Sequence, residues 1–173
     1  MKNWKKAWAI VFSLVMMLSL AGCGSREKFT GSTWVFIHQS ENGTSYIDEM
    51  KFEKNNKSYT ASTKTTSYEI RNHGKGGSLF GPIHYDYQVE VDESKPNIDP
   101  GLVFDEKSNS LTLHGFVAYT YMSKDNTVAE QGGKIFKKMS TEEIAKAKEQ
   151  LKANAQKEAE KRTEYYNKQQ NHI

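Results

Sequence analysis

The chain has 173 residues, of which 24 are basic and 21 acidic, and its mean hydropathy is −0.76. Three of the lysines precede residue 23, so the rest of the chain is electrically neutral, which argues against a nucleic-acid-binding protein because such proteins need positive charge. A single cysteine excludes an internal disulfide, and the length suits one modest domain with an appendage.

Residues 1–22 have the layout of an export signal. Lysines at positions 2, 5 and 6 precede an apolar run over residues 7–20. This run is shorter than the roughly 20 apolar residues that a membrane-spanning helix needs. We therefore expect a cleaved signal peptide over residues 1–22. The alternatives are an ordinary signal with a chance cysteine, or a short membrane anchor.

The residues at the end of this signal resemble the lipobox of bacterial lipoproteins: Leu20, Ala21, Gly22 and Cys23. The resemblance implies that a diacylglyceryl group is attached to the Cys23 thiol and that Cys23 becomes the new N-terminus. Two acyl chains bind a bilayer far more firmly than one. We expect a lipid-anchored protein on the extracytoplasmic face of the cell membrane or envelope, with residues 23–30 as the lipidated tether.

A β-domain is predicted over residues 31–139, and its first half begins with a hairpin. Apolar and polar residues alternate with a period of two over residues 34–38, and Asn42-Gly43 then provides a turn that tolerates positive φ. Residues 57–70 favour one long strand or two short ones because they are rich in Ser, Thr and Tyr. Between the Asn42-Gly43 turn and residue 57, alternation places four side chains on one face of a predicted strand: Tyr46, Asp48, Met50 and Phe52.

The second half of this domain contains two predicted loops and several shorter strands. Residues 71–82 are rich in glycine, and residues 93–101 contain two prolines. Residues 83–92 between them show the most regular alternation in the chain. The remaining predicted strands are residues 102–105, 111–114, 116–122 and 134–138. Tight turns separate them.

Seven to eight strands joined mostly by tight turns indicate a mainly β fold, an antiparallel up-and-down barrel or meander. The opening Gly31-Ser32-Thr33-Trp34, followed by hairpins and a closing strand rich in Lys and Phe, resembles the lipocalin-like β-barrels of small bacterial lipoproteins. META-type domains of envelope proteins open similarly, and a generic β-meander is the alternative. The lipocalin resemblance implies a barrel that carries a small apolar or amphipathic ligand.

A long polar helix is predicted over residues 140–168, before a short tail at residues 169–173. Ser140-Thr141-Glu142-Glu143 fits a capping box, and the residues after it are mostly Ala, Glu, Lys and Gln. The apolar stripe is thin, so we expect the helix to project from the barrel or to pack only its first turns. Pairing with another chain is the alternative, and an envelope protein is the expected partner of this helix.

No sequence pattern points to catalysis, a cofactor or a metal. The histidines lack the spacing of a zinc site, and residues 76–80 lack the second glycine of a nucleophile elbow. The glycine-rich segment also lacks the spacing of a phosphate-binding P-loop. We therefore predict a non-catalytic protein.

Aromatic residues are the remaining candidates for a site. They either fill a tight core or line a ligand cavity, and a filled core is favoured because an eight-stranded barrel is just wide enough for its own side chains. Two functions are compatible with this pattern: an envelope interaction module, or a carrier whose mouth lies at residues 71–82 or 93–101. The aromatic set is Trp34, Phe36, Tyr46, Phe52, Tyr85, Tyr87, Tyr119, Tyr121 and Phe136.

Overall fold

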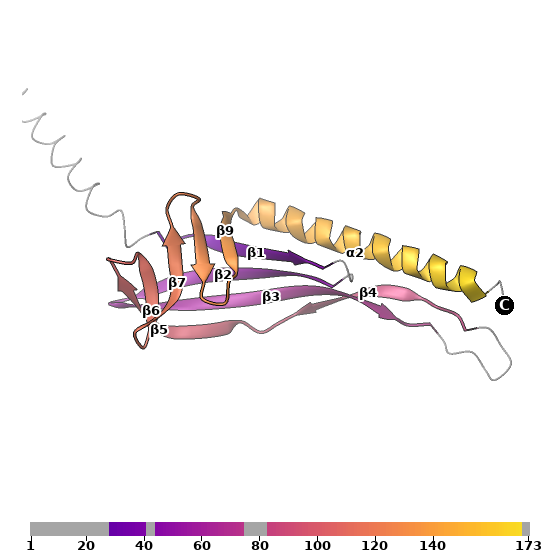
Figure 1. Cartoon of the computed structure of the whole chain (residues 1–173), viewed down its shortest axis with the longest axis horizontal. Coiled ribbons are helices and arrows are strands. Elements are labelled where there is room, and N and C mark those ends of the chain that lie inside the picture. The colour runs from indigo at the N-terminus through magenta and orange to yellow at the C-terminus, as the bar shows by residue number, and fades with distance from the viewer. Residues whose placement is uncertain (1–27, 41–43, 75–82, 171–173) are drawn as a thin grey trace, which may run out of the picture.

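The computed structural model of the chain describes residues 28–40, 44–74 and 83–170. The strands of these residues form one antiparallel sheet in the order β2-β1-β9-β8-β7-β6-β5-β3-β4. Additional pairing of β2 with β3 closes eight strands into a barrel, with β4 as an extra strand (Figure 1). A single helix, α2, follows the barrel in the described part of the chain. The predicted fold class is therefore confirmed.

The elements are β1 (Thr33–Gln39), β2 (Ser45–Asn55), β3 (Ser58–Asn72), β4 (Tyr87–Glu93), β5 (Asn97–Asp105), β6 (Ser110–Leu113), β7 (Phe116–Met122), β8 (Thr127–Glu130), β9 (Ile135–Met139) and α2 (Thr141–Gln170). β2 and β3 are much longer than most of the strands that complete the barrel, so they extend beyond it. β3 pairs with β5 over its first half and with β4 over its second half.

The predicted strands differ from the observed ones in three places. The strand predicted over residues 83–92 begins only at Tyr87. β5 begins inside the predicted proline loop, at residue 97. Its pairing with β3 shifts register between Tyr59 and Ala61, and Pro100 lies opposite this shift, where it interrupts no regular ladder. Proline is tolerated where a ladder is interrupted, and Gly101 there has a φ of 78°. β8 was not predicted, because four residues are too few to show a period.

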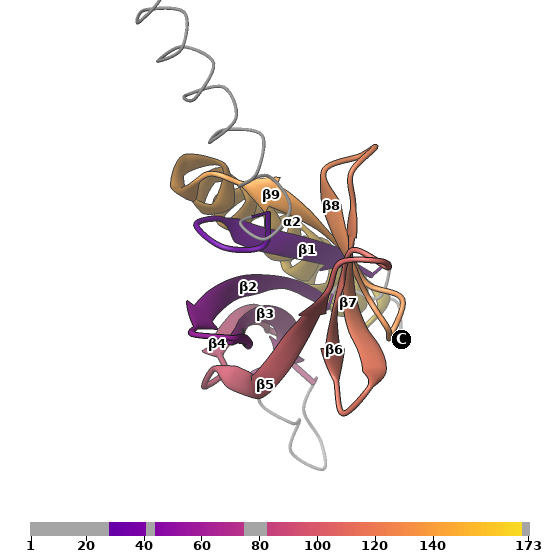
Figure 2. The same cartoon turned by 90° about the vertical axis from the view of Figure 1, so that its left-hand side faces the viewer.

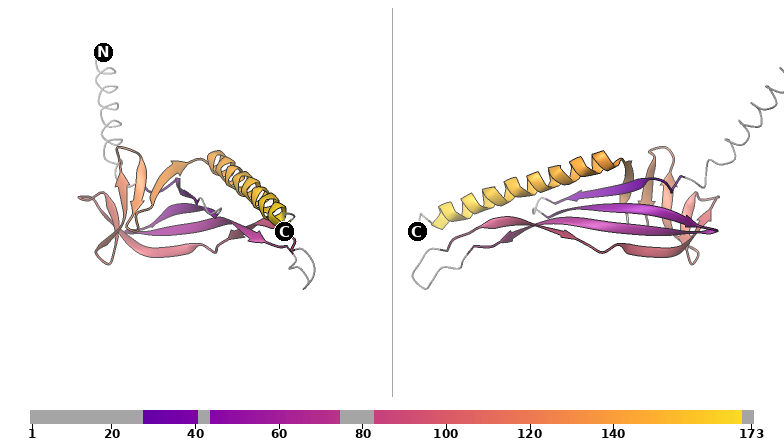
Figure 3. Two further views of the ribbon diagram at one scale, coloured as in Figure 1. Left: turned by 45° about the vertical axis from the view of Figure 1, so that its right-hand side comes forward. Right: turned by 180° about the vertical axis from the view of Figure 1, so that it is seen from behind.

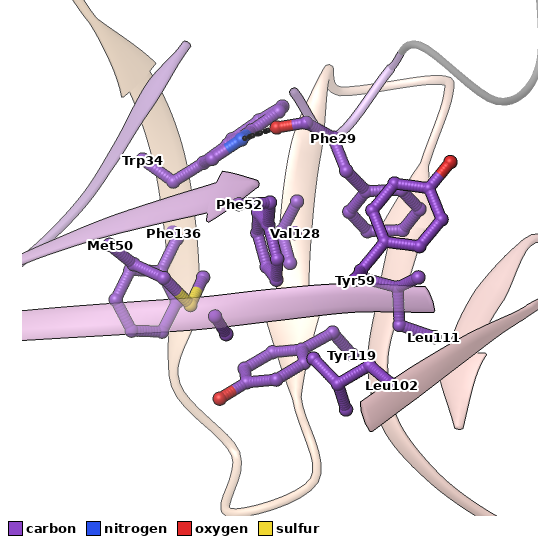
Figure 4. Close-up of a cluster of buried hydrophobic side chains, with 11 residues drawn as sticks. Phe29, Trp34, Met50, Phe52, Tyr59, Leu102, Leu111, Tyr119, Val128 and Phe136 are labelled. Atoms are coloured by element: carbon purple, nitrogen blue, oxygen red, sulfur yellow. Dashed lines mark hydrogen bonds between the residues drawn. The ribbon is translucent and has the colours of Figure 1, made fainter. Parts of the chain in front are cut away.

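The inner faces of the barrel strands form one apolar cluster (Figure 4). The Trp34 indole Nε1 donates a hydrogen bond to the Phe29 carbonyl oxygen at 3.0 Å. Phe29 is fully buried and contacts Phe52 edge-on, with ring centroids 5.2 Å apart. The predicted tether includes Phe29, but this residue instead closes one end of the barrel. The buried set is Phe29, Trp34, Met50, Phe52, Tyr59, Ala61, Leu102, Leu111, Tyr119, Val128 and Phe136.

A second cluster lies between α2 and the outer face of the long strands. Helix residues Ile144, Leu151 and Ala155 pack there against Val35, Ile47 and Tyr68. The expectation that α2 projects from the barrel or packs only its first turns was wrong, because β2, β3 and β4 together provide a surface along the helix (Figure 3) and residues as far along as Ala159 are buried. Both clusters are formed by residues of the described part of the chain.

The predicted capping box is present at the start of α2. The Glu143 backbone N–H donates to Ser140 Oγ at 3.2 Å, and the Ser140 backbone N–H donates to Glu143 Oε2 at 2.7 Å. The Ser140 hydroxyl also donates to Glu143 Oε2, at 2.8 Å. The hydrogen bond from the Ser140 backbone first, and then the one from its hydroxyl, hold the pKa of the Glu143 carboxyl below its ordinary value. The box fixes where the chain leaves β9 and enters the helix.

Candidate functional site

The predicted aromatic set divides into residues of the barrel and residues outside it. Trp34, Phe52, Tyr119 and Phe136 are buried in the barrel cluster, and Phe36 and Tyr121 pack against that cluster. Tyr46 stacks on His38, with ring centroids 4.9 Å apart. Tyr85 and Tyr87 lie outside the barrel, against the C-terminal part of α2.

The barrel also holds an ion pair between a buried carboxylate and a partly exposed lysine. Asp48 is 1% exposed, and its Oδ2 lies 2.7 Å from Lys134 Nζ. Thr65 Oγ1 donates to Asp48 Oδ1 at 2.6 Å. The ammonium lies 5.6 Å from the ring centroids of both Phe36 and Tyr46. Each carboxylate oxygen contacts one partner, so Asp48 links β2 to β3 and to the residue before β9.

The charge state of this pair depends on its surroundings. Burial lowers the pKa of Lys134, but the hydrogen bond and negative charge of Asp48 outweigh burial and leave the pKa above its ordinary value. Lys134 therefore stays cationic at neutral pH. Alternation places Asp48 on the inner face, but no local signal points to a lysine 86 residues farther along the chain.

Tyr119 is the buried phenol of the barrel. Its hydroxyl donates to Asp99 Oδ2 at 2.7 Å. Burial first, and then this hydrogen bond, raise the pKa of Tyr119 well above its ordinary value. The phenol therefore remains protonated at neutral pH and has no basic role there.

Acidic and histidine side chains do not converge elsewhere in the described part of the chain. It contains no group of three or more His, Cys, Asp or Glu residues placed to hold a metal ion. His73 makes an exposed contact with Glu90, in which Nε2 lies 3.0 Å from the carboxylate oxygen. Within the same residues, no helix is long and apolar enough to cross a membrane.

The last turns of α2 hold an extended segment, residues 83–87, through side-chain hydrogen bonds to its backbone. Asn167 accepts from the Tyr85 N–H and donates to the Tyr85 carbonyl oxygen, both at 2.9 Å. Thr163 and Gln170 accept from the N–H groups of residues 87 and 83, at 2.9 and 3.0 Å. Seven helical residues and four extended ones cover similar lengths, about 11 and 13 Å, so the groups stay in register.

Four tyrosines gather where this segment meets the helix: Tyr85, Tyr87, Tyr165 and Tyr166, here called the tyrosine tip. The ring of Tyr166 lies 5.1 and 5.6 Å from those of Tyr85 and Tyr87, and Tyr165 packs edge-on against it at 5.3 Å. Tyr165 is 59% and Tyr166 40% exposed. The tip lies toward the C-terminal end of α2, far from the barrel strands β5 to β8 (Figure 1).

The tyrosine tip lies outside the two cores, and the sequence pattern did not reveal it. The pattern places Tyr166 on the thin apolar stripe of the helix, and Tyr85 and Tyr87 in the barrel. The available signal was the Tyr165-Tyr166 pair at the end of a helix that otherwise has few large apolar residues. Tyrosine is enriched in protein interfaces because it combines a large apolar ring with a polar hydroxyl.

No protein-family model, curated protein sequence or solved structure matches the chain. The lipobox residues Leu20, Ala21, Gly22 and Cys23 lie outside the described residues. The lipid anchor and its membrane partner therefore stay predictions.

Proposed function

We propose that this chain is a lipid-anchored interaction module of the cell envelope. In this proposal Cys23 holds it on the extracytoplasmic face, and the tyrosine tip contacts an envelope protein. The supporting observation is that the barrel is packed with its own side chains, whereas a cluster of tyrosines that includes the exposed Tyr165 and Tyr166 stands at the other end of the molecule. The protein acts without catalysis, cofactor or metal.

Distances along the chain support a molecule with one end anchored near the membrane, at Phe29, and the other end, at the tyrosine tip, farther from it. Six Cα–Cα steps lead from Cys23 to Phe29 in the barrel, and this stretch spans at most about 22 Å when it is extended. The 30-residue helix α2 spans about 45 Å and carries Tyr165 and Tyr166 near its end. The barrel thus stays close to the membrane, and the tyrosine tip reaches away from it.

The surroundings of the tip have the composition of a protein interface. Beside the tyrosines, β3 and β4 carry charged residues: Arg71 is ion-paired with Glu69 and Glu90, at 2.8 and 3.1 Å. Asn72 on β3 faces Tyr87 on β4 in the sheet register, so this polar group borders the aromatic one. An aromatic centre beside a polar rim is typical of protein partners.

A photo-reactive amino acid at position 165 of the full-length chain tests the partner. We expect a covalent adduct with an envelope protein when the label replaces Tyr165. Phe116 is the matched control, because it is an aromatic residue 72% exposed on the barrel. Equal adducts at both positions, or none at position 165, would contradict the proposed role of the tip.

The anchor has its own test. We expect the protein recovered from membranes to begin at Cys23 and to carry the extra mass of acyl chains in an intact-mass measurement. Cys23→Ser should remove this mass and leave residues 1–22 uncleaved. A wild-type chain without acyl mass would refute the anchor.

A lipocalin-like carrier of a small apolar or amphipathic ligand is the alternative. It needs interior space, and eleven buried residues pack together inside the barrel. Native and denaturing mass spectrometry of residues 24–173 should give the same mass. A mass excess that disappears on denaturation would support the carrier instead.

A further inference from the structure

A basic hollow opens at the end of the barrel where the described chain begins. Its volume is about 310 Å³. It lies beside the turn between β2 and β3, and the residues that line it are Lys54, Asn56, Lys57, Tyr59 and Phe104.

The lining of this hollow combines free positive charge with an apolar floor. Lys54 and Lys57 are exposed, and neither forms an ion pair with a described residue. No carboxylate of the described residues lines the hollow, and the Asn56 amide adds hydrogen-bond donors. Tyr59 is buried and Phe104 half-buried, so aromatic rings lie beneath the charged rim. Such a lining suits a phosphate ester, with its anion on the lysines and its hydrocarbon on the rings.

The chain enters the barrel at this same end. Phe29 contacts Phe104 of the hollow edge-on, with ring centroids 6.2 Å apart. Lys28 lies over the Tyr121 ring, with its Nζ 5.1 Å from the centroid. Figure 2 looks at the molecule from this side and shows the β-barrel in front of the helix.

We propose that this hollow binds the phosphate of an anionic phospholipid headgroup and so orients the barrel on the bilayer. The inference rests on the proposed lipid anchor, because a tether of at most about 22 Å keeps this end next to the membrane surface. Lysines attract an anionic surface only within about one Debye length, roughly 10 Å. Lys28, Lys54 and Lys57 at the tethered end are in the position to do so.

Vesicle flotation of unlipidated residues 24–173 tests this inference. One set of vesicles contains phosphatidylcholine alone, and the other contains equal parts of phosphatidylcholine and phosphatidylglycerol. We expect binding only to the anionic vesicles and a marked decrease at high salt. The double variant Lys54→Gln/Lys57→Gln should bind roughly thirtyfold more weakly, at about fivefold per lysine near an anionic surface.

The matched control is Lys152→Gln/Lys157→Gln, which removes two exposed lysines from α2 and gives the same net charge. It should keep most of the wild-type binding, and thermal unfolding should show that both variants fold. Equal losses in the two variants, or equal binding of the wild type to both kinds of vesicle, would overturn the proposal. A site that takes up inorganic phosphate, seen as amide shifts at residues 56–58, without vesicle binding would overturn it too.

The lipid anchor and the headgroup site are tested by separate experiments, so one proposal can be refuted while the other stands. The flotation experiment uses a chain without acyl groups, so a negative result leaves the mass measurement of Cys23 unaffected. A chain without acyl mass that still binds anionic vesicles through Lys54 and Lys57 would refute the anchor and support the headgroup site.

Discussion

At the scale of single residues, Asp48 is a carboxylate that is almost fully buried in the barrel, and its burial opposes folding. An ionised carboxylate loses its hydration when it is buried, and only close partners offset that loss. Thr65 and Lys134 supply these partners, at 2.6 and 2.7 Å. The Asp48–Lys134 pair also depends on the register between distant strands. It can form only when β2 and the residue before β9 are both in place.

Lys134→Met should destabilise the protein by about 2 kcal/mol, because it leaves Asp48 buried without its cation. The loss is below that of a fully buried pair, because the Lys134 side chain is partly exposed to water. Urea unfolding at neutral pH measures the change. Lys137→Met on the exposed face of β9 is the control, and a similar loss in both variants would contradict this account.

The raised pKa of Tyr119 predicts that the free energy of unfolding decreases in alkaline solution. Its pKa is raised in the folded state above the ordinary value of 10.0, so stability is unaffected below pH 10 and falls as the pH rises further. Above that pH the unfolded chain releases the phenol proton while the folded chain retains it. Urea unfolding between pH 8 and 11 should show a shallower alkaline decline in Tyr119→Phe. Equal slopes in the two proteins would be inconsistent with this prediction.

At the scale of elements, α2 shows how a polar helix can still be held firmly. Its apolar stripe is narrow, but Ile144, Leu151, Ala155 and Ala159 are all buried. Beyond them, polar side chains continue the attachment through hydrogen bonds to residues 83–87. These bonds also satisfy backbone groups of an extended segment whose edge would otherwise be open to other strands.

Leu151→Ala should destabilise the protein by about 2–4 kcal/mol, because it removes the largest aliphatic side chain from the middle of the helix contact. The adjacent Lys152→Ala is the control and should change stability by less than about 0.5 kcal/mol. Both are measured by urea unfolding. Similar small effects in the two variants would mean that α2 does not pack on the sheet in solution.

At the scale of the whole molecule, the two cores have different roles. One closes the barrel next to the tether, and the other joins the long strands to the helix, which carries Tyr165 and Tyr166 of the tyrosine tip. Because the second core needs the helix, a partner-binding test that deletes α2 would disturb the fold as well as the tip. Position-specific cross-linking at residue 165 avoids this confusion.

Deleting residues 141–173 should leave the barrel cluster folded but expose Val35, Ile47 and Tyr68. We expect bound anilinonaphthalene sulfonate to fluoresce more strongly and the chain to self-associate, because the uncovered surface is apolar. Dye fluorescence and size-exclusion chromatography measure this, with the full-length chain as control. A monomeric truncated chain without dye binding would show that α2 does not cover this surface.

Local patterns in the sequence predicted most of the strands, the helix and its cap, because each depends on residues within a few positions of one another. A period of two marked the inner face of β2, and Ser140 with Glu143 marked the start of α2. The lipobox is also a local motif, and it lies outside the part of the chain that the structure describes.

Contacts between distant residues were decided only by the tertiary structure. Barrel closure through β2 and β3, the Asp48–Lys134 pair and the hold of Asn167 on Tyr85 each join segments whose spacing in the chain carries no period. Phe29 likewise reads as tether until the barrel end around it is assembled. Local periodicity determines which face of a strand or helix is apolar, but burial and long-range hydrogen bonding determine which faces meet.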